Sequence, residues 1–251
     1  MVVKCAGLPL AVKALGGTLG TKNPSVNDWS LVYDGIKSYL RGRNDGKKVL
    51  QVAEALKMSY LDLPYQLKQC FVHLGQFPED YKIPTTRVIN MWVAEGIIQK
   101  GSSADQIKEE EVEDVANRNL EDLVLRCMIQ VEKRGSTGRI TCFSMHDLMR
   151  DLSIQEAEKE KFFKSVYLED GNYQEEDDSS PPPLIQSNST RKIRRLSLYF
   201  MESISGVIPL EYERYAHIRG LLGFCLDGRV RIECESLVGY RGRNFKFLRV
   251  L

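Results

Sequence analysis

Several features that would narrow the function of this sequence are missing from it. No apolar run approaches the roughly 20 residues that a membrane-spanning helix needs. The opening stretch, MVVKCAGLPLAVKAL, is interrupted by Gly7 and Pro9, which argues against a signal peptide. Neither charge predominates, because 35 lysines and arginines face 34 aspartates and glutamates, for a net charge of +1. We therefore expect a soluble, cytoplasmic protein without a membrane span and with no general attraction to nucleic acid.

The sequence also lacks the motifs of common catalytic and metal sites. Its six cysteines form no C-x-x-C pair, so we expect reduced thiols. Cys142 with His146, and Cys70 with His73, have a spacing that could serve a metal, but neither has a second pair to complete four ligands. No G-x-S-x-G segment is present, and Gly20 is not followed by the lysine of a phosphate-binding loop. We predict no metal site, no catalytic residues and no enzyme activity.

What the sequence does contain, from residue 8 to 160, is mostly helical periodicity. The expected helices cover residues 9–19, 28–40, 49–56, 65–74, 86–95 and 105–126. Asn27 or Asp28 is expected to cap the second helix and Thr85 or Thr86 the fifth, because short polar side chains accept the unpaired N–H groups of a helix start. Gly96 is expected to close the fifth helix.

The periodicity changes after residue 126. The segment CMIQVEKRGSTGRITCFSM, residues 127–145, alternates like two short strands around a glycine-containing turn at 134–138, which predicts a β-hairpin. Several helices followed by a hairpin are the plan of a winged helix. An unrelated helix bundle with a stray hairpin has the same pattern, so both readings stay open at this point.

The last third of the chain differs in composition. Residues 169–192, EDGNYQEEDDSSPPPLIQSNSTRK, are acidic and then rich in serine and proline, which predicts a solvated linker. Beyond it, IRRLSLYF at 193–200, IRGLLGF at 218–224 and FKFLRVL at 245–251 resemble one another as short strands. Their spacing of 25 and 27 residues lies in the range of leucine-rich repeats, although any β-rich domain scatters such strands.

The segment SMHD at 144–147 marks the expected start of a further helix. Ser144 is placed to cap this helix and Asp147, three residues later, to reach back. His146 would then lie in the first turn, where unpaired N–H groups and the helix dipole favour an anion. The same dipole favours a neutral imidazole that donates one hydrogen bond over an imidazolium. The alternative is a surface histidine beside a cap.

Several segments, taken in order along the chain, resemble one family. CAGLPLAVKALGG at 5–17 resembles the GLPL motif, and MHDLMRDL at 145–152 resembles the MHD motif. Between them, LKMSYLDLPYQLKQCF at 56–71, CFVHLGQFPEDYKI at 70–83 and WVAEGII at 92–98 are similar to the family's CF…FPEDY…W-AEG pattern. These motifs belong, in this order, to the NB-ARC module of plant intracellular immune receptors with leucine-rich repeats, also called NLR disease resistance proteins. The resemblance is close over residues 1–165 and looser over 193–251.

This resemblance implies a mainly α fold in four parts. Residues 1–45 would form part of the helical ARC1 domain with the GLPL motif, and 46–165 the winged-helix ARC2 domain with the MHD motif. An acidic and proline-rich linker at 166–192 would lead to the first leucine-rich repeats at 193–251, the start of an α/β solenoid.

The resemblance also implies a nucleotide-operated switch in the innate immune defence of a plant, with the hypersensitive response as its output. ADP would be bound in the resting state. Pro9, with its neighbour Leu10, would pack against the adenine, His146 would hydrogen-bond the β-phosphate, and Asp147 would hold the loop and the helix start. Exchange of ADP for ATP would rotate ARC2 and expose surfaces that assemble with other receptor protomers.

Two parts of the family pattern have no counterpart in the sequence: the phosphate loop and the aspartate-bearing strand that holds magnesium. We therefore expect a truncated gene product or a piece of a receptor, which binds ADP only together with its own or a separate nucleotide-binding domain. The repeats would contact a pathogen effector or a guarded host protein. Two alternatives remain: a scaffold or decoy without a nucleotide role, and a winged-helix DNA-binding protein, which would need a basic recognition helix where the 105–126 helix begins strongly acidic.

Overall fold

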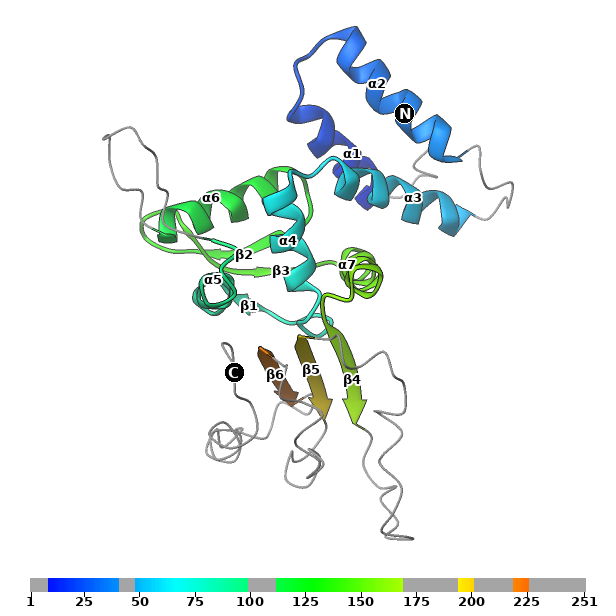
Figure 1. Cartoon of the computed structure of the whole chain (residues 1–251). Helices are drawn as coiled ribbons and strands as arrows, with labels where there is room; N and C mark the ends of the chain where they lie inside the picture. The colour runs from blue at the N-terminus through cyan, green and yellow to red at the C-terminus, as the bar shows by residue number, and fades with distance from the viewer. Residues whose placement is uncertain (1–8, 41–47, 99–111, 169–193, 201–218, 226–251) are drawn as a thin grey trace, which may run out of the picture. The chain divides into compact units, whose positions relative to one another are not determined.

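The computed structural model describes residues 9–40, 48–98, 112–168, 194–200 and 219–225 (Figure 1). The chain divides into two compact units. The first comprises Met1–Gly75 and Glu79–Ile154, and the second comprises Gln76–Pro78 and Gln155–Leu251. Within the described ranges, no helix combines the length and the apolar character needed to cross a membrane.

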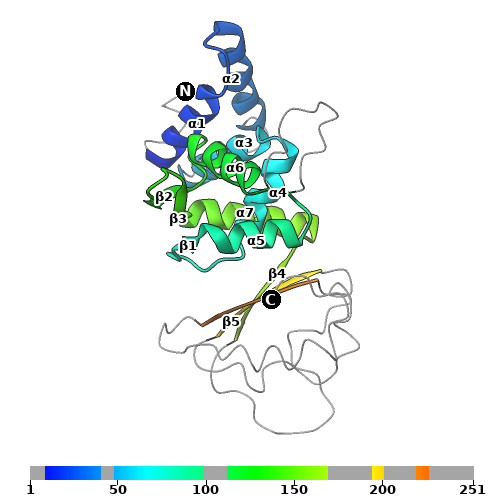
Figure 2. The same ribbon diagram turned by 90° about the vertical axis from the view of Figure 1, so that its left-hand side faces the viewer.

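The first unit begins with three helices: α1 (Pro9–Gly20), α2 (Val26–Leu40) and α3 (Lys48–Leu61). Both α1 and α2 pack against α3 (Figure 2). The sequence places Leu10, Ala14 and Leu15 at helical spacing, which predicts one apolar face of α1, and this is confirmed because all three are buried. The predicted cap of α2 is wrong: Ser25 Oγ accepts the N–H of Asp28 at 3.1 Å, so the helix begins two to three residues earlier than Asn27 or Asp28 would place it.

The rest of the first unit is the predicted winged helix. It contains α4 (Tyr65–Leu74), β1 (Ile83–Pro84), α5 (Thr85–Ala94), α6 (Val112–Leu125), β2 (Gln130–Arg134), β3 (Ile140–Ser144) and the first part of α7 (Asp147–Glu160). The end of α7, from Gln155 on, belongs to the second unit. The hairpin of β2 and β3 is confirmed, and β1 adds a third antiparallel strand in the order β1-β3-β2. Helix α6 packs on α4, α5 and β3. The core between these elements holds large, fully buried side chains, including those of Trp92, Phe71, Phe143, Leu120 and Met149.

The predicted start of α5 is wrong, and its predicted end is confirmed. Neither Thr85 nor Thr86 caps it, because the helix already starts at Thr85 and its preceding residue is Pro84, which has no side-chain acceptor. Gly96 follows the helix with a φ of 74°, as predicted for a closing glycine. Of the predicted helix at 105–126, residues 105–111 lie outside the described part of the chain.

The second unit contains a parallel sheet of β4 (Lys164–Leu168), β5 (Arg195–Phe200) and β6 (Gly220–Cys225), in that order. The strands predicted at 193–200 and 218–224 are confirmed as β5 and β6. Residues 166–168, predicted as linker, belong instead to β4. The predicted strand at 245–251 and the connections between the strands lie outside the described residues, so the leucine-rich repeats stay a prediction.

One face of this sheet carries a row of aromatic rings. Tyr167, Tyr199 and Phe224 occupy equivalent positions on the three strands, and their ring centroids are 4.5 Å and 5.5 Å apart. Phe77, from the three-residue segment of the second unit that precedes β1, contacts the edge of this row at 5.5 Å from Phe224. The hydroxyl of Tyr199 donates to the carbonyl of Gln76 at 2.7 Å. Gln76–Pro78 therefore packs with strands that lie far along the chain.

Candidate functional site

His146 forms the N-terminal cap of α7. Its carbonyl accepts the N–H groups of Met149 and Arg150 at 2.8 Å and 3.0 Å, and its Nδ1 accepts the N–H of Leu148 at 3.3 Å. Because an accepting Nδ1 carries no proton, the proton of a neutral imidazole lies on Nε2. The side chain is exposed, so Nε2–H can donate to a group outside the helix.

The predicted cap by Ser144 is wrong. Ser144 still belongs to β3 and pairs with Gln130 of β2, and its hydroxyl donates to Glu132 Oε1 at 2.7 Å. A residue held in the strand is too far from the first turn to accept its N–H groups. Asp147 is the first residue of α7 and is exposed, and in the described part of the chain its carboxylate does not reach back to Ser144.

Helix α7 is fixed by contacts on its opposite face. The sequence places Met145, Leu148, Met149 and Leu152 on one helical face; Met145, Met149 and Leu152 are buried, and Leu148 is partly buried. Ser153, fully buried, has its hydroxyl 3.2 Å and 3.0 Å from the carbonyls of two successive residues of α4, Phe71 and Val72. The start of α7 therefore rests on a rigid core, which keeps the position of His146 well defined.

Pro9 and Leu10, the other predicted contacts, lie at the start of α1. Pro9 is exposed and Leu10 is buried, with 8% of its surface accessible. No contact described for the first unit joins either of them to His146 or Asp147. The structure thus places the two predicted pairs at two helix starts, α1 and α7, without bringing their side chains together.

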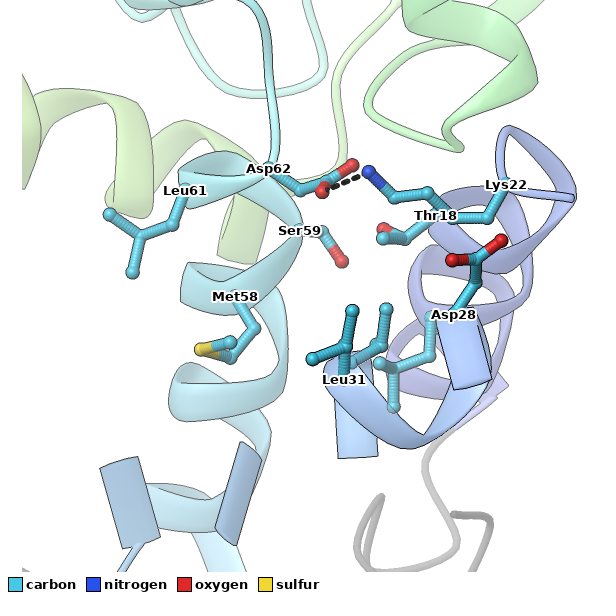
Figure 3. Close-up of a pocket in the computed structure, with 10 residues that line it drawn as sticks. Thr18, Lys22, Asp28, Leu31, Met58, Ser59, Leu61 and Asp62 are labelled. Carbon is cyan, nitrogen blue, oxygen red and sulfur yellow. Dashed lines mark ion pairs between the residues drawn. The ribbon is translucent and has the colours of Figure 1, made fainter. Parts of the chain in front are cut away.

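The structure also contains a cavity that no sequence motif indicated. It lies between α1, α2 and α3, and its volume is about 410 Å³ (Figure 3). Leu15, Leu31 and Met58 give it apolar walls, and Lys22 and Asp62 form an ion pair of 2.6 Å at its edge. Leu15, the lining residue of α1 nearest to Pro9, lies six residues after it, roughly 9 Å along the helix axis. The cavity is therefore distinct from the predicted contacts at Pro9.

Two cysteines of the first unit have raised thiol pKa values, which disfavour the reactive thiolate. Burial raises the pKa of the Cys70 thiol to about 12, and burial also raises the pKa of Cys127. His73, near Cys70 in the sequence, is buried in the same helix. Among the described residues, no three histidine, cysteine, aspartate or glutamate side chains are grouped so that they could hold a metal ion.

The chain was compared with known protein families and with characterised proteins. Residues 77–153, which span β1 to α7 and include His146, match the winged helix domain of disease resistance proteins. The disease resistance protein RPH8A of Arabidopsis thaliana is 36% identical over 255 residues, covering 100% of this chain and 25% of that protein. The disease susceptibility protein LOV1 is 37% identical over 200 residues, covering 79% and 20%, and the disease resistance protein RPP8 is 38% identical over 168 residues, covering 66% and 17%, both in the same plant.

These relatives are much longer than the chain, which spans between 17% and 25% of their length. The match nevertheless extends beyond the winged helix, since the alignment with RPH8A includes the three N-terminal helices and the parallel sheet. The chain belongs to the family of plant disease resistance proteins.

Proposed function

We propose that the chain is the regulatory part of an ADP/ATP-operated switch in a plant disease resistance protein, and that it binds ADP together with a nucleotide-binding domain. The observation that carries this proposal is the hydrogen bond from the Leu148 N–H to Nδ1 of His146. It leaves Nε2–H as a donor at the positive end of the 14-residue helix α7, where an anion is favoured.

Each predicted contact then has a separate role. His146 would donate Nε2–H to the β-phosphate, and the exposed ring of Pro9 at the start of α1 would pack against the adenine. Leu10 is buried, so in this proposal it holds the start of α1 in place and does not touch the base. Bound nucleotide would supply the phosphate charge that links the start of α7 to the nucleotide-binding domain.

Asp147 would act through the helix. Its carboxylate is the first side chain of α7, where a negative charge interacts favourably with the helix dipole, by about 0.3–1 kcal/mol. Replacing the equivalent aspartate by valine in a full-length relative is expected to loosen the start of the helix and its phosphate contact. Cell death without a pathogen trigger is the expected result in a leaf expression assay. Unchanged ADP retention without cell death would contradict this role.

Calorimetric titration with ADP tests the proposal directly. The chain alone is expected to give little heat, and its mixture with a separately produced nucleotide-binding domain of a relative is expected to bind ADP more tightly than that domain alone. His146→Ala should weaken this gain about 10-fold or more, because a hydrogen bond to a charged group is lost. Asp151→Ala, at an exposed position one turn further along α7, is the control and should leave affinity unchanged.

The chain and the separately produced nucleotide-binding domain also test the two alternative functions, a scaffold without a nucleotide role and a DNA-binding protein. A mixture that binds its domain partner but shows no effect on ADP binding would favour a scaffold role. DNA binding is disfavoured by α6, the helix before the wing, because it carries four acidic residues, Glu113, Asp114, Glu121 and Asp122, against one arginine, Arg118. Tight binding to duplex DNA in a low-salt gel shift would contradict the proposal.

A further inference from the structure

Asp62 joins the ends of three helices. It follows the last residue of α3, on the short connection that leads into α4. One of its carboxylate oxygens lies 2.6 Å from Nζ of Lys22, which follows the end of α1 (Figure 3). The other lies 2.9 Å from Nη1 of Arg126, which follows the end of α6. A single carboxylate thus contacts one cation from the three-helix group and one from the winged-helix domain.

A backbone contact coincides with this pair of bridges. Gly17 of α1 lies so close to the end of α6 that an added Cβ would be 2.7 Å from both the carbonyl oxygen of Leu125 and the Cα of Arg126. Only a residue without a side chain fits there. The close contact of Gly17 with the end of α6 and the Asp62 ion pairs therefore involve the same residue, Arg126.

The two arms of the bridge differ in exposure. The side chain of Arg126 is 11% exposed and that of Asp62 is 22% exposed, whereas that of Lys22 is 36% exposed at the cavity. An ion pair that is shielded from water is less screened by salt, and a buried charge that loses its partner is costly. The Arg126 arm should therefore hold more strongly than the Lys22 arm.

The end of α3 has its own attachment to the winged-helix domain. The ring of Tyr60 packs on Phe71 of α4 with centroids 5.7 Å apart, and Leu63 is buried. Asp62 is therefore held in place by the chain on both sides of it. Helix α1 approaches the end of α6 at Gly17, and Lys22, just after α1, takes part in the Asp62 bridge.

We propose that Asp62 is a conformational clasp that holds α1 against the end of α6, and that opening it lets α1 move relative to the winged-helix domain. This inference rests on the proposed function in one respect: α1 carries Pro9 and α7 carries His146, so the clasp would set the spacing of the two nucleotide contacts. The clasp itself requires no nucleotide.

Hydrogen exchange with mass spectrometry on the full chain tests the clasp. The N–H of Lys22 bonds to Leu19, and the N–H of Met128 to Leu123, so both ends of the contact have measurable protection. In Asp62→Asn, exchange over 18–22 and 126–128 is expected to rise about 10-fold, the loss expected for a charge-assisted hydrogen bond. The hairpin and helix start at 140–149 should be unchanged. Asp28→Asn, which lines the same cavity but takes no part in these bridges, should exchange as the parent does.

Two outcomes of that measurement overturn the clasp. One is unchanged exchange at both ends in Asp62→Asn. The other is an equal rise in every segment, which would mean that Asp62 only adds to general stability. A second set of variants tests the clasp independently. Arg126→Met and Lys22→Met should each raise exchange over 18–22 in the parent chain, and Arg126→Met should raise it more. Neither substitution should raise exchange further when it is combined with Asp62→Asn. Additive effects would contradict a shared bridge.

An ADP-release measurement distinguishes failure of the clasp from failure of the proposed function. Asp62→Asn, mixed with the nucleotide-binding domain of a relative, is expected to release ADP several-fold faster than the parent mixture. Local exchange that rises in Asp62→Asn while neither mixture retains ADP would support the clasp and overturn the proposed function. ADP retention that depends on His146 but not on Asp62, with unchanged exchange, would overturn the clasp alone.

Discussion

The thiol of Cys70 illustrates how burial controls the chemistry of one residue. It lies in α4 with 0% of its surface exposed, and burial raises its pKa to about 12. Because the thiolate is the reactive form, Cys70 should remain unmodified by iodoacetamide at pH 7.5 in the folded chain. Peptide mass spectrometry should find Cys142, which is only half-buried, modified under the same conditions. Equal labelling of both before urea is added would contradict the buried position of Cys70.

At the level of single residues, helix caps were the least predictable feature. The sequence pattern predicted Ser144 as the cap of α7, whereas the cap is His146, because the choice depends on where β3 stops pairing with β2. The cap of α2 is Ser25 and not Asn27. The sequence alone could not identify it, because several short polar side chains close together can each accept an N–H group. The exposure of Pro9 was likewise decided by packing.

Among the elements, α1 offers a matched test in two adjacent glycines. Gly17→Ala places a Cβ against the backbone of Leu125 and Arg126, where nothing can move aside easily, so it should lower the free energy of unfolding by about 1–3 kcal/mol. Gly16→Ala meets no atom within 4 Å and should raise it by about 0.5–1 kcal/mol, because alanine favours a helix interior over glycine. Urea denaturation of both variants measures the difference. Equal effects would exclude the close approach of α1 to α6.

The ion pair between α6 and β2 gives the wing a pH dependence. Arg134 donates two hydrogen bonds to Glu121, at 2.5 Å and 3.0 Å, and they lower the pKa of Glu121. A carboxyl group with a lowered pKa stabilises the fold above its unfolded pKa of about 4.3, and this contribution is lost as the pH falls through the folded pKa. Glu121→Gln should therefore lower the unfolding temperature slightly at pH 7, and the difference from the parent should shrink as the pH falls below about 4.3. A difference that stays constant over this range would point to packing.

Elements with several turns or an alternating pattern could be predicted from the sequence, and short or distant ones could not. The helices of the winged helix and its hairpin followed from periodicity and turn residues such as Gly96. Strand β1 has only two residues, Ile83 and Pro84, so it leaves no pattern, and it exists because β3 offers an edge to pair with. Strand β4 was missed because its partner β5 is more than twenty residues away, and parallel pairing is decided by tertiary contacts.

On the scale of the whole molecule, the second unit is discontinuous in sequence. The chain enters it at Gln76 for three residues and again at Gln155. Gln76 receives hydrogen bonds from two side chains of β5, Ser197 at 3.3 Å and Tyr199 at 2.7 Å. The domain ranges that the family resemblance implies are contiguous, and this unit is not. A substitution in the FPED segment should consequently affect the parallel sheet as well as the winged helix that flanks it in sequence.

Tyr199→Phe tests this assignment within the second unit. Its hydroxyl is buried and donates to the carbonyl of Gln76, so removing it leaves a buried carbonyl without that donor, at a cost of about 1–3 kcal/mol. Hydrogen exchange should therefore rise in β5 and β6 and stay unchanged in the hairpin of β2 and β3. Tyr167→Phe is the control, because Tyr167 holds the equivalent position on β4 but is 54% exposed, and its loss should change stability by less than about 0.5 kcal/mol. If both variants exchange alike, Gln76 is not held by the sheet, and the second unit would consist of residues after 154 alone.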